Sequence, residues 1–597
     1  MKARIVRAPF TVMTFFVLLL AVSRPHIALA EHGSPAHIVG HHASNRRPAT
    51  RSFLHNKVPN GDLRDDLRTA INVALGAGNS LDRRRLQTIR DKLWPMWQSL
   101  AKNEHDRVDR RSLRYAVHRY LLHWYSISVI GLEPLHANGS HDEARVLTKY
   151  MPAYVRTVLE GQAARQGFSI DDAVAMIVAL ERLVQDSPFE ILKAIYENLA
   201  YNIHSALDRE QMTQVLEDFM IRWMLGEDME SILDFEANPD TRETSFEDWN
   251  HIAEFARGRM LSFEYSRDFA NRAVDSSWNP LVPAFSFGDA QAISGGITMS
   301  FGRFWETECA RVKDSLVSMD HGTTGRVKLS DFHGAALAGE WRFSESKDYL
   351  RELGALDESS SWHGPQVIIT NYLQSPSNCI VYSPHYRVCC ANECEDVIGD
   401  IEAAVSSPLA LPEDILRIVS NITASLEDDA PSLKGGLTKQ LHEIARASGG
   451  KIPIHGRLFS QWLHYAYPHQ CSFPHKAGTT TTLTPLEYGE EYMASSQELE
   501  HHAGELEMKV EAVALEAVNS SSSHEAEWMT QWSHEEELLT ENLKLTAPWE
   551  STLTAGIIGF FLTLVVGLAV LVAKITLAEG SKDALPTHYG GLKAHLV

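Results

Sequence analysis

An uncharged run near the C-terminus constrains the fold of this chain more than any other feature. It extends over 22 residues, from Thr552 to Ala573, and a helix of that length covers about 33 Å, enough to cross a bilayer core. Trp549 precedes the run and Lys574 follows it, as is typical of membrane interfaces. We therefore expect a transmembrane helix over 551–574. The alternative is a buried core helix, and such helices are rarely apolar on all sides for this length.

The N-terminus has the pattern of a secretory signal peptide. Basic residues between Lys2 and Arg7 precede a largely apolar run, and a small-residue cleavage pattern ends at Ala30. The alternative, an uncleaved anchor, is less favoured because the apolar run is short for a span. A cleaved signal peptide over 1–30 and one later span predict a type I membrane protein. Its N-terminal bulk would be lumenal or extracellular, in the secretory pathway or at the plasma membrane, and 575–597 would form a cytosolic tail.

The net charge excludes one large class of partners. The chain has 55 Lys and Arg against 77 Asp and Glu, and Glu487 to Glu550 alone contains 16 Glu, no Asp and two Lys. No basic face is concentrated enough to neutralise phosphates, so we expect no nucleic-acid binding. We expect 481–550 to be an acidic stalk that leads to the membrane.

The partners that the sequence does predict are the membrane, an unidentified protein and a second copy of the chain. Small residues at i and i+4 in the expected span, Ala555 with Gly559 and Thr563 with Gly567, permit close helix packing. A homodimer through the transmembrane helix would use these pairs.

Composition divides the outer part into three segments. Residues 31–60 are rich in His, Ser and Pro without periodicity, which indicates a disordered leader; a metal-binding His tract is the alternative. Residues 61–345 have apolar residues at helical spacing, and Ser169 and Asp171 are suitable N-caps. Residues 346–480 are richer in Pro, Gly, His and Cys and form a second module. Within that module we expect a short extended segment at Val367–Thr370 and helices over Leu411–Leu426 and Leu437–Ala447.

The six cysteines favour disulfides. All lie in one stretch, and they are Cys309, Cys379, Cys389, Cys390, Cys394 and Cys471. An even number in an oxidising compartment is typical of disulfide bonding, and no second Cys/His pair stands at zinc spacing. The sequence leaves the pairing open. Glycosylation sequons begin at Asn138, Asn421 and Asn519, all on the expected outer side.

One segment resembles the calcium-binding EF-hand. The loop from Asp320 to Asp331 has carboxylates at positions 1 and 12, Gly325 at position 6 and Val327 at position 8. Apolar residues at helical spacing flank it on both sides. The same frame recurs without acidic ligands at 101–112 and 200–211. This resemblance implies helix–loop–helix pairs whether or not a metal binds.

Calcium itself would be held weakly. The ligand positions 1, 5, 7 and 12 of the loop are Asp320, Thr324, Arg326 and Asp331, and position 3 is Gly322. Calcium needs six to eight oxygens, mostly from these positions, and only two of the residues are carboxylates. We expect millimolar affinity at best in this loop and none in the other two frames.

Short segments elsewhere resemble uncharacterised secretory single-pass membrane proteins of protists. They are Arg342–Gly354, Ser375–Cys379, Cys389–Glu395, His455–Phe459 and Phe473–His475. The resemblance covers about residues 85–480 and implies common lineage without an activity.

Together these patterns predict a mainly α protein with an EF-hand-like helical outer domain, a disulfide-stapled second module and one C-terminal transmembrane helix. We expect it to bind or scaffold other molecules, with calcium as its only potential cofactor. No catalytic motif such as HExxH or GxSxG is present. The alternative is a lumenal hydrolase or redox enzyme that uses the Cys- and His-rich residues of 346–480, and a reactive thiol near Cys379 would favour it.

Overall fold

The structure is a computed structural model that describes most of residues 83–503, with larger gaps at 133–165, 239–248, 275–283 and 423–432. It also describes 529, 531–540, 542 and 543. The expected signal peptide, the leader, the cytosolic tail and nearly all of the expected span lie outside the described residues.

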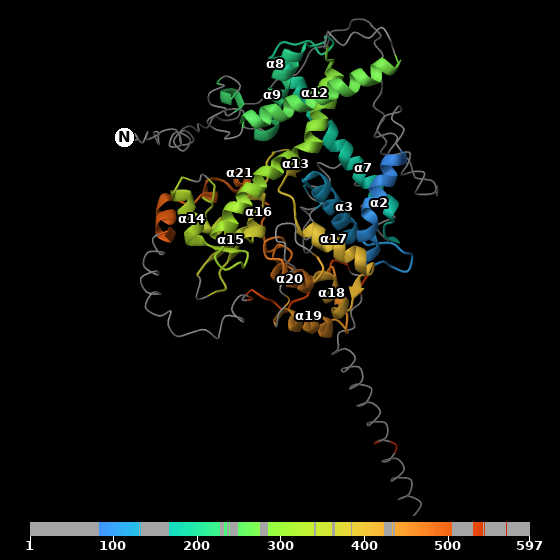
Figure 1. The fold of residues 1–597 in the computed structure, drawn as a ribbon, viewed down its shortest axis with the longest axis vertical. Helices are drawn as coiled ribbons and strands as arrows, with labels where there is room; N and C mark the ends of the chain where they lie inside the picture. Colours follow the sequence, from blue (N-terminus) through green and yellow to red (C-terminus); the bar gives the residue numbers. More distant parts are fainter. Residues whose placement is uncertain are drawn as a thin grey trace, which may run out of the picture. The chain divides into compact units, whose positions relative to one another are not determined.

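The described chain is mainly helical, as the sequence predicts (Figure 1). The α-helices are α2 Arg83–Ser99, α3 Arg110–Tyr125, α7 Ile170–Asp186, α8 Pro188–Asn198, α9 Arg209–Leu225, α12 Trp249–Val274, α13 Phe287–Met319, α14 Leu329–Leu337, α15 Lys347–Glu352, α16 Ile369–Leu373, α17 Cys394–Val405, α18 Pro412–Val419, α19 Gly436–Ala447, α20 Arg457–Ala466 and α21 Pro485–Tyr488. Two 3-10 helices are η1 Pro376–Asn378 and η2 Glu490–Tyr492.

Short strands join segments that are distant in the sequence. They are β1 Ile127–Val129, β2 Arg326–Lys328, β3 Leu356–Asp357, β4 Gln366–Ile368, β5 Tyr386–Val388, β6 Leu409–Ala410 and β7 Ile452–Pro453. β1 pairs with β5 and β6 pairs with β7, while β4 lies between β2 and β3, all antiparallel. The extended segment expected at Val367–Thr370 thus includes the end of β4 and the start of α16.

Several helices begin at capping boxes that the sequence encodes. In α7 the Ser169 side chain accepts from the Asp172 amide, and the Asp172 carboxylate accepts from the Ser169 amide at 2.7 Å. Each bond satisfies a backbone donor that the first turn of a helix leaves open. Ser169 is therefore the N-cap, as expected, and Asp171 lies within the first turn. The same arrangement starts α9 with Asp208 and Gln211, and α13 with Ser286 and Asp289.

Loops between helices pair with one another through their backbones. Antiparallel pairing joins Val108 with Phe168, Leu207 with Phe285, and Val327 with Val367. Val108, Leu207 and Val327 stand at position 8 of the three loop frames found in the sequence. Each paired residue is fully or almost fully buried, so the pairing brings two helix–loop–helix units together around apolar side chains.

A further pair of helix–loop–helix units forms most of the region from 394 to 466. The loop between α17 and α18 contributes β6, and the loop between α19 and α20 contributes β7. An apolar cluster that includes Ile401, Leu441 and Trp462 fills the space between these helices. The helix expected over Leu437–Ala447 is α19. The one expected over Leu411–Leu426 is α18, which ends earlier, at Val419; residues 423–426 lie outside the described residues.

All six cysteines are paired, which confirms the expected disulfides and supplies the pairing that the sequence left open. The bridges are Cys309–Cys390, Cys379–Cys389 and Cys394–Cys471. The first joins α13 to the segment that precedes α17, and the third joins α17 to the segment that follows α20. The second module is therefore cross-linked internally and to the long helix α13.

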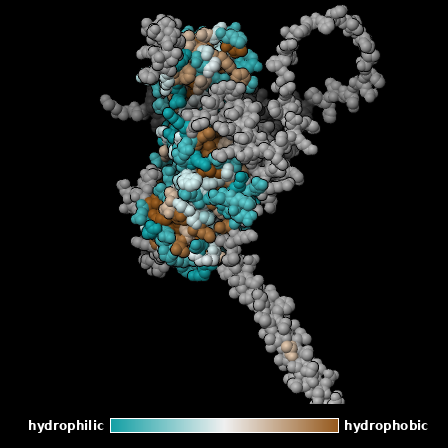
Figure 2. Space-filling view, turned by 90° about the vertical axis from the view of Figure 1, so that its right-hand side faces the viewer, coloured by the Kyte–Doolittle hydropathy of each residue, from teal (hydrophilic) through white to brown (hydrophobic). Residues whose placement is uncertain are grey.

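Among the described residues, no helix has both the length and the apolar character needed to cross a membrane. The expected span, 551–574, lies almost wholly outside those residues. Figure 2 shows a largely hydrophilic surface on one face, interrupted by patches of hydrophobic residues. The large hydrophobic residues most exposed on the described surface include Leu486 and Tyr265, at 63% and 75%.

Candidate functional site

The carboxylate of Asp320 is already held by donors of the protein. Asp320 follows the last residue of α13, and its Oδ2 accepts from the Gly325 amide at 2.6 Å and from Nε2 of His469 at 2.9 Å. Its Oδ1 accepts from the Gly322 amide at 3.1 Å. Burial acts to raise the pKa of Asp320, but the hydrogen bonds from His469 and the loop amides outweigh it and lower the pKa.

The other residues expected at ligand positions are spread over different roles. Arg326 lies in β2 with its guanidinium buried; it donates to Asp357 Oδ2 at 2.8 Å and to the Thr324 carbonyl at 3.1 Å. The Thr324 hydroxyl lies 3.4 Å from Asp320 Oδ1. Asp331 lies in the first turn of α14. The structure thus places Asp320, Thr324 and Arg326 in one hydrogen-bonded loop. One of the three, Arg326, carries a buried positive charge.

Gly325 allows this loop to turn against the second module. Its φ is +72°, a conformation that side chains with a Cβ rarely adopt. A Cβ built at this position would lie 2.4 Å from the Pro468 carbonyl oxygen. The segment from Pro468 to His469 is therefore packed directly on the loop, and it supplies the imidazole that bonds Asp320.

The donor set does not suit a calcium ion in this arrangement. The Asp320 oxygens accept from two amides and an imidazole, and the Thr324 carbonyl accepts from a guanidinium. Over the part of the chain that the structure describes, no cluster of three or more His, Cys, Asp or Glu side chains could hold a metal ion. Calcium would have to displace these donors.

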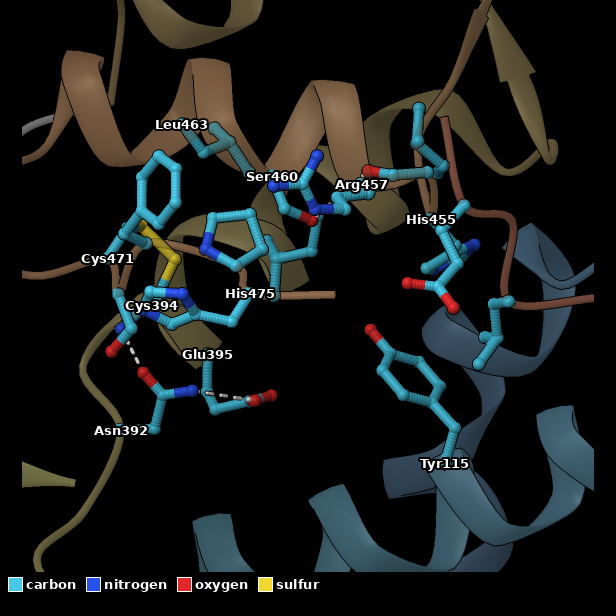
Figure 3. A pocket seen from close by; sticks show the side chains of 18 residues that line it. Tyr115, Asn392, Cys394, Glu395, His455, Arg457, Ser460, Leu463, Cys471 and His475 are labelled. Atoms are coloured by element: carbon cyan, nitrogen blue, oxygen red, sulfur yellow. Dashed lines mark hydrogen bonds between the residues drawn. A yellow bond between two sulfur atoms is a disulfide. The ribbon is translucent and has the colours of Figure 1, made fainter. Parts of the chain in front are cut away.

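A second candidate site is a cavity of about 270 Å³ between α3, α17 and α20. Its walls include Tyr115, Glu395, His455 and the Cys394–Cys471 disulfide. Figure 3 shows the Tyr115 hydroxyl and the Glu395 carboxylate pointing into the same space from α3 and α17. The cavity therefore combines apolar walls with convergent ionisable groups, which is the usual composition of a small-molecule site.

A buried charge network lies behind one wall of the cavity. Arg119 of α3 forms ion pairs with Glu395 and, at 2.6 Å, with Glu402. Arg119 also donates to the Tyr115 hydroxyl at 2.8 Å, and Nε2 of His455 donates to Glu402 at 2.8 Å. All the charges in this network have partners, as burial requires. The network fixes the orientation of Tyr115 and His455 at the cavity.

The two carboxyl groups of the network differ in electrostatic environment. Burial raises the pKa of Glu395 above its ordinary value despite the neighbouring Arg119. For Glu402, burial also acts to raise the pKa, but Arg119 and His455 together lower it. Burial is again the main reason that the pKa of the Tyr115 hydroxyl is raised. Of the two carboxyl groups, Glu395 is therefore the one that more readily keeps a proton.

Sequence reasoning found only part of this cavity. The Cys- and His-rich residues of 346–480, which the sequence indicates as an alternative site, include His455 and His475. Tyr115, Arg119 and Glu402 were not identified. One sequence signal was available. Glu402 is a charged residue next to the apolar Ile401, on the side of the helix that is expected to be buried. The partner on α3 is 283 residues away in the sequence, so no local pattern could identify it.

No protein-family model matches the chain, and no curated protein or solved structure is detectably similar to it. The geometry of the two sites is therefore the basis for any functional assignment.

Proposed function

We propose that the protein is a type I membrane protein whose lumenal or extracellular part binds or scaffolds other molecules. Its outer part is built from EF-hand-like helix–loop–helix units, and it holds calcium weakly at most. The observation that carries the proposal is the pairing of loops at position 8 of each frame, because this is where the two hands of an EF-hand pair join through a short strand.

Two further observations support the proposal. The pairing residues Phe168 and Phe285 were not recognised in the sequence. Each is nevertheless followed at once by a helix with a side-chain N-cap, as in the frames at 101–112 and 200–211. At position 12 of these partner loops stand Asp172 and Asp289, whose carboxylates bond the N-cap amides. Side chains at a calcium position are thus used to start helices, and the frames can persist without metal.

The disulfides support the proposed lumenal or extracellular location. Three bridges are typical of a protein that folds in an oxidising environment, such as the secretory pathway or the cell exterior.

Calcium titration of the full chain in detergent micelles tests the weak-binding claim. We expect binding at about millimolar affinity or none, because an ion would have to displace His469 and the loop amides from Asp320. Any heat should be lost in Asp320→Ala and retained in Asp314→Ala, an exposed charge on α13. Micromolar affinity in the wild type, or binding that survives Asp320→Ala, would contradict the proposal.

A second function, small-molecule hydrolysis in the cavity, is favoured by the convergence of Tyr115, Glu395 and His455. A carboxyl group with a raised pKa is suited to donate a proton to a leaving group. Turnover of chromogenic ester and glycoside substrates by the full chain would test it. Turnover should fall at least about 100-fold in Glu395→Gln if Glu395 is the acid. Equal rates in the wild type and this variant would exclude the role.

A further inference from the structure

The segment 531–540, named here the acidic strap, lies against α20, although the two segments are far apart in the sequence. Gly456 and Leu538 form an antiparallel bridge. The Arg457 amide donates to the Glu537 carbonyl at 3.0 Å, and the Leu539 amide donates to the His455 carbonyl at 3.3 Å. The strap therefore adds an extended strand-like segment to the chain that enters α20, which is one of the ways in which proteins bind peptides.

Gln461 recognises the backbone of the strap. Its side chain is fully buried; it donates to the Ser533 carbonyl at 3.0 Å and accepts from the Ser533 amide at 2.9 Å. An amide side chain that bonds both groups of one residue holds an extended peptide independently of that peptide's side chains. A buried glutamine that faced no peptide here would leave both of its polar groups without these partners.

The acidic side chains of the strap face donors of α20 and the loop after it. Oε1 of Glu536 accepts from the Leu458 amide at 3.1 Å, in the first turn of α20, where the helix dipole favours a negative charge. Arg457 donates to the Glu535 carbonyl at 3.0 Å. Lys476 forms an ion pair with the Glu535 carboxylate. The surface of α20 and of the loop after it that contacts the strap, called the groove here, thus meets two neighbouring acidic residues with donors.

An aromatic residue anchors the other end. The Trp532 side chain packs against the apolar cluster of the second module, with its ring 6.2 Å from that of Tyr465. Gln531 accepts a hydrogen bond from the buried Arg326 at 3.1 Å. An aromatic anchor, a bound backbone and acidic residues three and four positions later together define a short linear ligand.

The strap also covers the cavity between α3, α17 and α20. Glu537 and Leu539 form part of its lining, and the Ala477 amide donates to Glu537 Oε2 at 3.1 Å. From residue 503 to residue 529 the chain outside the described part is 25 residues long, enough to span up to about 85 Å. This covalent length would allow the strap to leave the groove and return while it remains part of the chain.

We propose that the groove along α20 is a recognition site for an extended acidic peptide with an aromatic anchor, and that the chain's own strap fills it in cis. The partner in trans would have the same chemistry and would have to displace the strap. The strap contacts the 320 loop through the hydrogen bond from Arg326 to Gln531. Its contacts with α20 involve no metal, so the proposal holds whether or not calcium binds in that loop.

A labelled synthetic peptide of residues 529–542 tests the proposal by fluorescence anisotropy. The receptor is the full chain in detergent, as wild type and as Trp532→Ala/Glu536→Gln, which weakens the strap. We expect the weakened variant to bind the peptide at least about tenfold more tightly, because a tethered strap competes at about millimolar effective concentration. Adding Gln461→Ala should abolish binding. Equal binding with and without Gln461, or no binding to a folded weakened variant, would overturn the proposal.

A second experiment remains decisive if the weakened variant fails to fold. Protease sites placed within 504–528 and after Thr546 leave the wild-type strap in place but no longer tethered. Excess labelled peptide should then exchange with the cut strap, which would elute after the protein, in the late small-peptide fraction of a size-exclusion column. A cut strap that stays bound without exchange would show that the strap is a structural part of the fold, and would overturn the proposal. If two copies exchange their straps, a dimer should form, and excess peptide should dissociate it into monomers. This outcome would also support the proposal.

Discussion

Buried charges in this protein have partners from distant parts of the chain. Asp320 bonds His469 across 149 residues, and Lys313 bonds Glu393 across 80. Removing a charge from water is costly unless an opposite charge and hydrogen bonds compensate for it. At the scale of single residues, these pairs join the 320 loop and α13 to the second module. Asp320, which the sequence predicts as a calcium ligand, thus also makes a structural contact.

Gly325 provides the clearest test at this scale. Gly325→Val should lower the thermal midpoint of unfolding by several degrees, because φ of +72° and a 2.4 Å approach to the Pro468 oxygen exclude a branched side chain. Gly334→Ala is the control: a Cβ there meets no atom within 4 Å, so the midpoint should stay constant or rise. Circular dichroism measures both. An unchanged midpoint for Gly325→Val would contradict the positive φ and the close contact with Pro468 at this turn.

Glu402 should make stability depend on pH. Its folded-state pKa is lowered, so it stabilises the fold above the ordinary Glu pKa of about 4.3, and this contribution is lost as the pH falls through the folded value. Glu402→Gln should cost about 3 kcal/mol at pH 7. The difference from the wild type should shrink below about pH 4. Denaturant unfolding measures this, with the exposed Glu413→Gln as the matched control. A cost that did not vary with pH would contradict the role of the charge.

At the scale of elements, helix pairing and cross-links determine how the units meet. The long helix α13 runs from the group around α9 and α12 towards α14 and α16 (Figure 1). Gly302 lets it touch the end of α3, since a Cβ there would lie 2.4 Å from the Tyr125 carbonyl oxygen. The Cys309–Cys390 bridge lies further along the same helix. One element therefore contacts both groups of helices.

The disulfides should differ in their contribution to stability. Cys394–Cys471 spans 77 residues and Cys379–Cys389 spans 10, so the longer bridge restricts the unfolded chain more. The chain-entropy relation gives roughly 4.5 and 3 kcal/mol. Removing each pair by Cys→Ser substitution should lower the unfolding free energy in that order. Peptide mapping without reduction checks the pairing first. Six alkylatable thiols would show that no disulfide is present and would contradict the prediction.

At the scale of the whole molecule, apolar clusters do not follow the divisions suggested by composition. One cluster runs from Val312 to Leu373, across the boundary expected at 345. The charge network at Arg119 connects the first helices to the second module. Part of the expected acidic stalk, 531–540, lies against α20. Burial of apolar surface depends on which faces meet in space, so composition along the chain does not determine these units.

Glycosylation tests the proposed topology. Asn421 is exposed at the end of α18 and begins a sequon, so a lumenal outer part should present it to the glycosylation machinery. Asn421→Gln should remove one glycan and increase gel mobility by one step. Enzymatic deglycosylation should bring the wild type and the variant to the same mobility. An outer part that carried no glycan at any of the three sequons would contradict a lumenal location.

The sequence by itself determined the features that depend on neighbouring residues. Helical periodicity, the Ser169 N-cap and the positive φ of Gly325 follow from local sterics and hydrogen bonding. Disulfide bonding followed from an even cysteine count in an oxidising compartment.

Only the tertiary structure decided which distant residues meet. The cysteine pairing, the His469 imidazole on Asp320, the Arg119 network and the strap on α20 each join residues dozens to hundreds of positions apart. No local pattern encodes such contacts, because they depend on how apolar faces pack and on which buried charges then find a partner.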